Sequence, residues 1–170
     1  IEKLALTENG FCGISLGDQV SDVAYKIGDV DPAAYLGNWV NEITENRVFN
    51  GVQVVIMATF PRLWLTSEHN GIVMWQDYGD GRYGASKLTL AIPCHKEYND
   101  NMDGKRVELY ETICNYYREQ CHAVLKETNE STSLFQIGFS DISTSETHTY
   151  QILVGQDIEY DCVTVEISKE

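Results

Sequence analysis

The stretch Gly13-Ile-Ser-Leu-Gly-Asp-Gln-Val-Ser-Asp-Val-Ala-Tyr-Lys-Ile-Gly28-Asp-Val-Asp-Pro32 predicts a short helix lying on a sheet. Gly17-Asp18 is expected to open this helix, because the Asp18 carboxylate can accept hydrogen bonds from the free amides of the first turn. Gly28 is suited to end the helix, and Pro32 cannot continue it. The residues that recur at the spacing of one helical face are apolar: Val20, Val23, Ala24 and Ile27.

The same stretch resembles the helix opening of the BamE-like family, also called the small outer-membrane lipoprotein A family. Those domains follow a leucine/isoleucine-x-x-Gly-Met-Thr-x-x-x-Val-x-x-x-Leu-Gly-x-Pro pattern and have an antiparallel sheet. Here Leu16-Gly17-x5-Val23-x4-Gly28 resembles that pattern, Asp18-Gln19 replaces Met-Thr, and the proline comes later, at Pro32. The resemblance covers residues 13–32. It implies a fold fragment and an exported bacterial protein, of an adaptor or inhibitor kind without catalytic residues.

The net charge of −14 at pH 7, over 170 residues, is the unusual feature of the composition. It argues against binding DNA, RNA or anionic membrane surfaces, because all three require positive charge on the protein. It suits a basic protein partner, although acidic surfaces also keep proteins soluble. The sequence contains no run of 18 apolar residues, so we expect no membrane span. The oligomeric state stays open.

The chain begins at Ile1 rather than at an initiator methionine. We therefore expect that a preceding segment was removed, either by a signal peptidase or in preparing the protein. Removal by a signal peptidase would make the protein periplasmic or secreted, and a cytoplasmic protein is the alternative.

The odd number of cysteines leaves at least one thiol unpaired within a monomer. The five are Cys12, Cys94, Cys114, Cys121 and Cys162. Cys114 and Cys121 are expected on one helix, about 10 Å apart along its axis, so they cannot bond to each other. A disulfide would have to join distant segments, such as Cys94 to a helix cysteine or Cys12 to Cys162. Both pairings, and no pairing at all, stay open.

Two Asn-Gly dipeptides, Asn50-Gly51 and Asn70-Gly71, predict tight hairpin turns. Each lies between strand-forming residues, and both residues of such a turn adopt positive φ. We expect Pro61 to separate the two hairpins, which belong to a meander of about five strands ending before Pro93. Two-residue turns would place Val48 opposite Gln53 and Thr66 opposite Trp75.

A second helix is predicted from about residue 104 to 126. Its apolar stripe repeats at 3-4-3-4-3 spacing, at Val107, Tyr110, Cys114, Tyr117, Cys121 and Val124. Three strands are expected after it, at about 134–142, 147–155 and 157–167. The apolar phase changes near Cys162, which a β-bulge would explain.

The predicted elements therefore follow the order helix, meander, helix, meander, whereas parallel crossover units would interleave strands and helices singly. This order predicts an α+β fold: antiparallel sheet meanders with a short N-terminal helix and one longer central helix packed on the sheet. We expect a single domain over residues 1–170. Two helix-plus-meander halves, about 1–93 and 94–170, are the variant of this organisation.

No motif indicates a catalytic residue, a cofactor or a metal. Cys94-His95 and Cys121-His122 are adjacent pairs, but neighbouring residues point in different directions, so each pair would supply one of the four ligands that zinc needs. A cysteine nucleophile would need an electropositive setting, which the net charge of −14 disfavours. The segment 99–104 has the glycine of a calcium loop, but Tyr110 stands where the bidentate glutamate belongs.

Aromatic residues concentrate on the second predicted hairpin. With the turn at Asn70-Gly71, Trp64 and Trp75 share one face and lie diagonally across the ladder. Both faces of this hairpin are substantially apolar. One face covers the core, and the other needs a helix, a loop or a partner. The candidate partner-binding residues are Trp39, Trp64, Trp75 and Tyr78.

These features favour a noncatalytic exported bacterial protein that binds another protein, of the inhibitor, immunity or envelope adaptor type. A small hydrolase or redox enzyme using a Cys/His pair is one alternative. A small-molecule carrier with a pocket between sheet and helix is another. A fast-reacting thiol would favour the enzyme, whereas slow, buried thiols would favour the binding protein.

Overall fold

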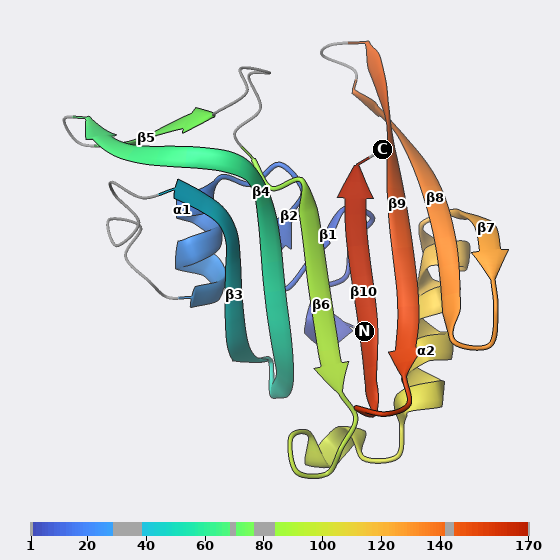
Figure 1. Ribbon diagram of the computed structural model, residues 1–170. Helices are drawn as coiled ribbons and strands as arrows, with labels where there is room; N and C mark the ends of the chain where they lie inside the picture. Colours follow the sequence, from blue (N-terminus) through green and yellow to red (C-terminus); the bar gives the residue numbers. More distant parts are fainter. Residues whose placement is uncertain (1, 29–38, 69–70, 77–83, 142–144, 170) are drawn as a thin grey trace.

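The computed structural model describes residues 2–28, 39–68, 71–76, 84–141 and 145–169. For residues 39–40, 62–68, 71–76, 139, 141 and 146 it describes the backbone and not the side chain. The described chain forms a mixed fold with a large antiparallel sheet, and the helices lie on one face of that sheet (Figure 1). The broad α+β prediction agrees with this architecture.

Eight strands of the described chain form the large sheet, in the order β3-β4-β6-β10-β9-β8-β7, with β5 also paired to β4. A separate hairpin pairs β1 with β2. The bounds are β1 Gly10–Phe11, β2 Ile14–Ser15, β3 Trp39–Phe49, β4 Val52–Glu68, β5 Gly71–Gln76, β6 Lys87–Pro93, β7 Val124–Thr128, β8 Thr132–Asp141, β9 Glu146–Asp157 and β10 Cys162–Lys169. Because β6 pairs with β10 along its whole length, the first meander and the second form one continuous sheet.

The burial patterns of β6 and β10, two central strands, indicate that the described elements cover one face of the sheet. Their alternate residues are fully buried, and the residues between them are half-buried. Successive side chains of a strand point to opposite faces, so one face packs in the core and the other is open. The fully buried set is Leu88, Leu90 and Ile92 in β6 with Val163, Val165 and Ile167 in β10.

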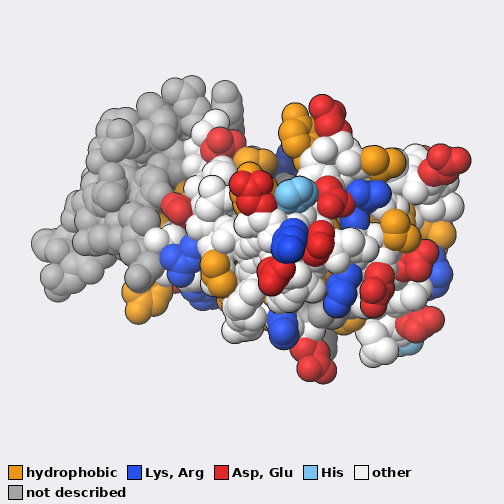
Figure 2. Space-filling model, turned by 90° about the horizontal axis from the view of Figure 1, so that it is seen from below, with side chains coloured by type: hydrophobic (Ala, Val, Ile, Leu, Met, Phe, Trp, Pro, Cys, Tyr) orange, Lys and Arg blue, Asp and Glu red, His pale blue; other side chains and the backbone are white. Residues whose placement is uncertain are grey.

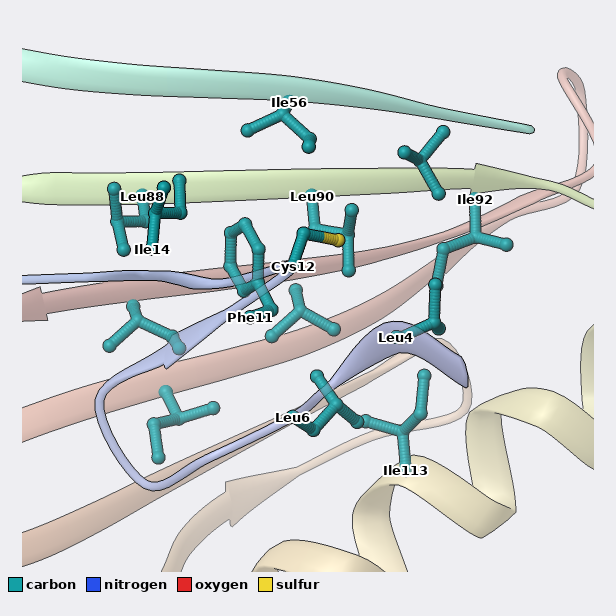
Figure 3. Close-up of a cluster of buried hydrophobic side chains, with 14 of the residues drawn as sticks. Leu4, Leu6, Phe11, Cys12, Ile14, Ile56, Leu88, Leu90, Ile92 and Ile113 are labelled. Carbon is teal, nitrogen blue, oxygen red and sulfur yellow. The ribbon is translucent and has the colours of Figure 1, made fainter. Parts of the chain in front are cut away.

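An N-terminal layer that the sequence did not predict covers part of this apolar face (Figure 3). It consists of a 3-10 turn at Glu2–Leu4 followed by the β1–β2 hairpin. Figure 3 shows Leu6 beside Ile113, while other side chains of this layer point toward the strands. The strand-facing residues are Leu4, Phe11, Cys12 and Ile14, each at most 3% exposed.

Hydrogen bonds hold this layer in place at both sides. The Tyr116 hydroxyl donates to the carbonyl of Leu6 at 2.7 Å. The side-chain Nδ2 of Asn50 donates to the carbonyl of Lys3 at 2.8 Å. The layer is therefore tied to the second helix and to the β3–β4 turn, two parts of the chain distant from it in sequence.

The first helix has the predicted buried stripe but a different start. It comprises α1 Val20–Val23 and a π-helical turn at Ala24–Gly28, and the four stripe residues are at most 2% exposed. It does not open at Gly17-Asp18, because the backbone of these residues pairs with Ala85. Asp18 forms no helix cap; its carboxylate accepts from the Ser15 amide at 3.0 Å. The helix is also not N-terminal, since the layer described above precedes it.

The second helix is shorter than the predicted 104–126. It comprises α2 Arg106–Asn115 and a π-helical turn at Tyr116–Gln120, and β7 already begins at Val124. His122 adopts a φ of 55°, and the Ala123 amide donates to the Tyr117 carbonyl at 2.9 Å. A residue in the left-handed conformation just after the last helical turn commonly ends a helix, and His122 occupies that position here.

The predicted stripe of the second helix is correct at its centre and wrong at its ends. Tyr110, Cys114 and Tyr117 are buried, whereas Cys121 is half-buried. Val107 and Val124 are 51% and 57% exposed. Val124 is exposed because it lies in the edge strand β7 rather than on the helix.

The β3–β4 turn agrees with the prediction, whereas the position of Pro61 differs from it. Asn50-Gly51 forms the predicted turn, with φ values of 49° and 83° and Val48 opposite Gln53. Pro61 does not separate two hairpins but lies within β4, between the part paired to β6 and the part paired to β5. A register shift in the β3–β4 ladder also falls here, and such a site tolerates a residue without an amide hydrogen.

The phase change near Cys162 comes from a turn and not from a bulge. Asp157 pairs directly with Cys162, and the residues between them connect β9 to β10. Ile158 and Tyr160, which alternate like strand residues in the sequence, are 73% and 72% exposed in this turn. The predicted strand 157–167 therefore begins five residues late, at Cys162.

Tyr117 offers a test of the core, because it is fully buried and its hydroxyl has no hydrogen-bond partner among the described residues. Its ring lies 5.2 Å from that of Tyr116 and 6.2 Å from that of Phe135. We expect Tyr117→Ala to lower the free energy of unfolding by about 3–5 kcal/mol. Tyr117→Phe should raise it by about 1 kcal/mol, because it removes an unsatisfied buried hydroxyl.

Urea unfolding measures both variants, with Glu119→Ala as the control. Glu119 is exposed on the same helical segment, and its truncation should change stability by less than about 0.5 kcal/mol. Equal urea midpoints for Tyr117→Ala and Glu119→Ala would contradict the assignment of the buried face.

Gly84 tests a close backbone approach. A Cβ at Gly84 would overlap the backbone of Gly17, whereas a Cβ at Gly138 would meet nothing within 4 Å. We expect Gly84→Ala to destabilise the fold by about 1–3 kcal/mol, as in overpacked sites. Gly138→Ala should be neutral or slightly stabilising, because alanine lowers the entropy of the unfolded chain. Similar thermal midpoints for the two variants would show that the backbones of Gly17 and Gly84 move apart at little cost.

Candidate functional site

The three tryptophans predicted to bind a partner occupy one row of the sheet. Trp39 of β3 lies opposite Trp64 of β4, and Trp64 lies opposite Trp75 of β5. Directly opposed residues of an antiparallel ladder belong to the same face. The backbone register therefore brings together residues that are 36 positions apart in the sequence.

The predicted register of the second hairpin is wrong by two residues. Glu68 pairs with Gly71, so Gly71 begins β5 instead of forming the turn, and Thr66 lies opposite Val73. Trp64 and Trp75 are consequently direct partners and not diagonal neighbours. Residues 69–70, which connect the strands, lie outside the described residues, as does Tyr78, the fourth candidate.

The five cysteines are free thiols in the structure. Cys12 and Cys94 are 2% and 0% exposed, and burial raises their pKa values to about 12 and about 11. Burial also raises the pKa values of Cys114, Cys121 and Cys162. A nucleophilic thiol needs the opposite shift, toward the thiolate at neutral pH. Each thiol is thus protonated and poorly reactive at pH 7.

The adjacent Cys-His pairs diverge as their sequence spacing suggested. Cys94 is fully buried, whereas His95 is exposed and its Nδ1 accepts from the Glu97 amide at 3.2 Å. Cys121 is half-buried, and His122 is exposed at the helix end. Among the described residues, no group of three or more His, Cys, Asp or Glu side chains is placed to hold a metal ion.

Asn99, the first position of the calcium-loop pattern, has a structural role that the sequence did not predict. It is 3% exposed, and its Oδ1 accepts from the Gln53 amide at 2.6 Å. Its Nδ2 donates to the carbonyls of Gln53 and Pro93, at 2.9 and 2.6 Å. The side chain therefore anchors the connection between β6 and α2 to the sheet and is not available to a cation.

The carrier alternative requires a cavity between sheet and helix. A cavity of about 270 Å³ lies there, lined by Val52 and Ile92 of the sheet, Leu109 of α2 and Leu4 of the N-terminal layer. Binding sites for small molecules usually enclose about 300–1,000 Å³. The cavity is therefore at the lower limit for a carried ligand.

The lower end of the molecule exposes aromatic side chains but has mixed charge. Tyr98, in the connection between β6 and α2, is 61% exposed, and Tyr160 of the β9–β10 turn is 72% exposed. Figure 2 shows acidic and basic side chains interspersed over this end. This end therefore presents no single charge that a partner would complement.

A search of protein-family models, curated proteins and solved structures finds no match to this chain. In the described part of the chain, the helices are too short and too polar to traverse a lipid bilayer. The site assignment therefore rests on the residues and their arrangement.

The raised thiol pKa values predict a pH dependence of stability. The folded chain keeps the protons of Cys12 and Cys94 at a pH where an unfolded thiol, with a pKa near 8.5, has lost them. The folded state binds more protons in this window, so its stability falls as the pH rises above about 8.5. Urea midpoints between pH 7 and 10 measure the decline, and a Cys12→Ala, Cys94→Ala double variant should decline less steeply.

The same shifts predict slow alkylation. At pH 7 to 8 the native protein should react with iodoacetamide far more slowly than the urea-unfolded chain. A single thiol that reacts in the native protein as fast as in the unfolded chain would contradict the assignment and revive the cysteine-enzyme alternative.

Proposed function

We propose that this protein is a noncatalytic binding protein that recognises another protein through the tryptophan row of β3, β4 and β5. The observation that carries the proposal is the register that places Trp39, Trp64 and Trp75 side by side. Tryptophan is among the residues that contribute most to binding energy at protein interfaces. The paired backbone positions gather three residues of this type in one row of the sheet.

The charge and the thiols support the same function. A net charge of −14 favours rapid association with a basic partner through long-range attraction. The raised pKa values of the thiols weigh against a cysteine nucleophile. An inhibitor, immunity or envelope adaptor protein is the type that combines these features, and the resemblance of residues 13–32 to the BamE-like family favours an exported bacterial protein.

The test begins with capture of the partner from the source organism, followed by binding kinetics at low and at physiological salt. We expect the association rate to fall steeply with salt, because screening reduces the reach of the acidic surface to about 8–10 Å. We expect Trp64→Ala to accelerate dissociation at least about tenfold, because anchor residues act mainly on the dissociation rate. Trp39→Ala and Trp75→Ala should act in the same direction.

Tyr160→Ala is the matched control, since Tyr160 is an exposed aromatic residue in the β9–β10 turn. It should leave both rates unchanged. Tryptophan variants that keep the wild-type circular dichroism spectrum and dissociate no faster would remove the row from the interface. An association rate that ignores salt would remove the acidic surface.

A further inference from the structure

The open face of the sheet contains a hollow that no described element covers. It has a volume of about 550 Å³ and lies over β7, β8, β9 and β10. Its lining includes two leucines, two glutamates and several hydroxyl and amide side chains, but no lysine or arginine. The hollow lies on the opposite side of the sheet from the two helices, so it is distinct from the core.

Four of its residues form one continuous row across the strands. Glu127 of β7 lies opposite Leu134 of β8, which lies opposite Leu153 of β9, which lies opposite Glu166 of β10. Neighbouring strands are about 4.8 Å apart, so the backbones at the two ends of the row are about 14 Å apart. The row thus has an apolar centre and a carboxylate at each end.

The row is accessible and its charges are uncompensated. Leu153 is 37% exposed and Leu134 is half-buried. Within the described part of the chain, neither Glu127 nor Glu166 forms an ion pair. Lys87 of β6 is a nearby cation, because it lies opposite Ser168, and Ser168 is two residues from Glu166 on β10. Neither glutamate nevertheless forms an ion pair with it. Two carboxylates on a shared apolar floor favour positive charge in the hollow.

We propose that this hollow binds an extended segment of a basic protein. The segment has one apolar residue, with one lysine or arginine two positions before it and another two positions after it. The segment crosses the strands along the row. An extended chain advances about 3.3 Å per residue and directs alternate side chains to one face. Basic residues four positions apart therefore span about 13 Å, with an apolar residue midway on the same face, which matches the row.

Other occupants fit less well. A single metal ion cannot bridge the two carboxylates, because its ligands must lie within about 2.6 Å of it. Nucleic acids and anionic lipids carry the same sign of charge as the hollow. A second copy of this chain has no suitable segment, since none of its 12 lysine and arginine residues lies four positions from another. A basic partner segment remains as the fitting occupant.

This binding site shares no residue with the tryptophan row, so it stands or falls separately from the proposed function. The test uses the full chain and two fluorescein-labelled peptides of equal composition, measured by fluorescence anisotropy at low salt. The first, Thr-Lys-Thr-Leu-Thr-Lys-Thr, has the matching spacing. The second, Thr-Thr-Lys-Lys-Leu-Thr-Thr, has adjacent lysines. We expect the first to bind about twofold to fivefold more tightly, because it alone pairs both carboxylates.

Three charge-neutralising variants localise the binding. Glu127→Gln and Glu166→Gln should each weaken binding of the first peptide about twofold to fivefold, as expected for exposed and half-buried charge pairs. Glu159→Gln, in the exposed β9–β10 turn, changes the net charge equally and should weaken it less than twofold. Circular dichroism checks that all three fold.

Three results would overturn the proposal. Equal affinity for the two peptides would show that spacing is not recognised. Equal weakening by Glu159→Gln and the hollow variants would show attraction to net charge alone. Absence of measurable binding at millimolar peptide would show that the hollow does not take such a segment.

Discussion

The structure depends on covering one apolar face of a continuous antiparallel sheet. Because β6 pairs with β10 along its whole length, the two meanders share this face and their buried residues form one core. Neither helix is long enough to cover it alone. The N-terminal layer fills the remaining area, and the hydrogen bond from Tyr116 to the Leu6 carbonyl locks that layer against the second helix. Loss of either helix or of the N-terminal layer would therefore expose part of a core that both meanders share.

Because the described elements cover one face of the sheet, reactive side chains on the two faces have different surroundings. On the covered face, groups that could react are used for packing: the thiol of Cys12 faces the strands, and the hydroxyl of Tyr117 has no partner among the described residues. Low polarity around these groups raises their pKa values and keeps them neutral. The uncovered face has the opposite character, with hydroxyl, amide and carboxylate groups open to water. The described polar groups that a second molecule could contact therefore lie on the uncovered face and not in the core.

Local signals in the sequence were sufficient for the first helix stripe and for the Asn50-Gly51 turn, because both depend on residues within one turn or one hairpin. The helix end at His122 was not predictable, since a histidine replaces the glycine that usually adopts this conformation. The prediction for Pro61 was wrong because proline occurs both where a strand ends and where a continuous strand changes its pairing partner, and the sequence does not distinguish the two. The tryptophan candidates were found by residue type, but the row required the register of three strands. The hollow left no sequence signal, because Glu127 and Glu166 come together only when β7 to β10 are aligned.

The charge balance bears on the basic partner that we propose. With 26 acidic and 12 basic residues, full pairing of every base would still leave 14 carboxylates without a counter-charge. Unpaired carboxylates repel one another, and this repulsion lowers the stability of the folded state. Glu127 and Glu166 flank the half-buried Leu134 and the exposed Leu153 in a hollow, where hydration is poorer than on a convex surface. In the binding mode that we propose, a basic segment in the hollow would relieve this repulsion, and the same acidic charge would attract the segment from a distance.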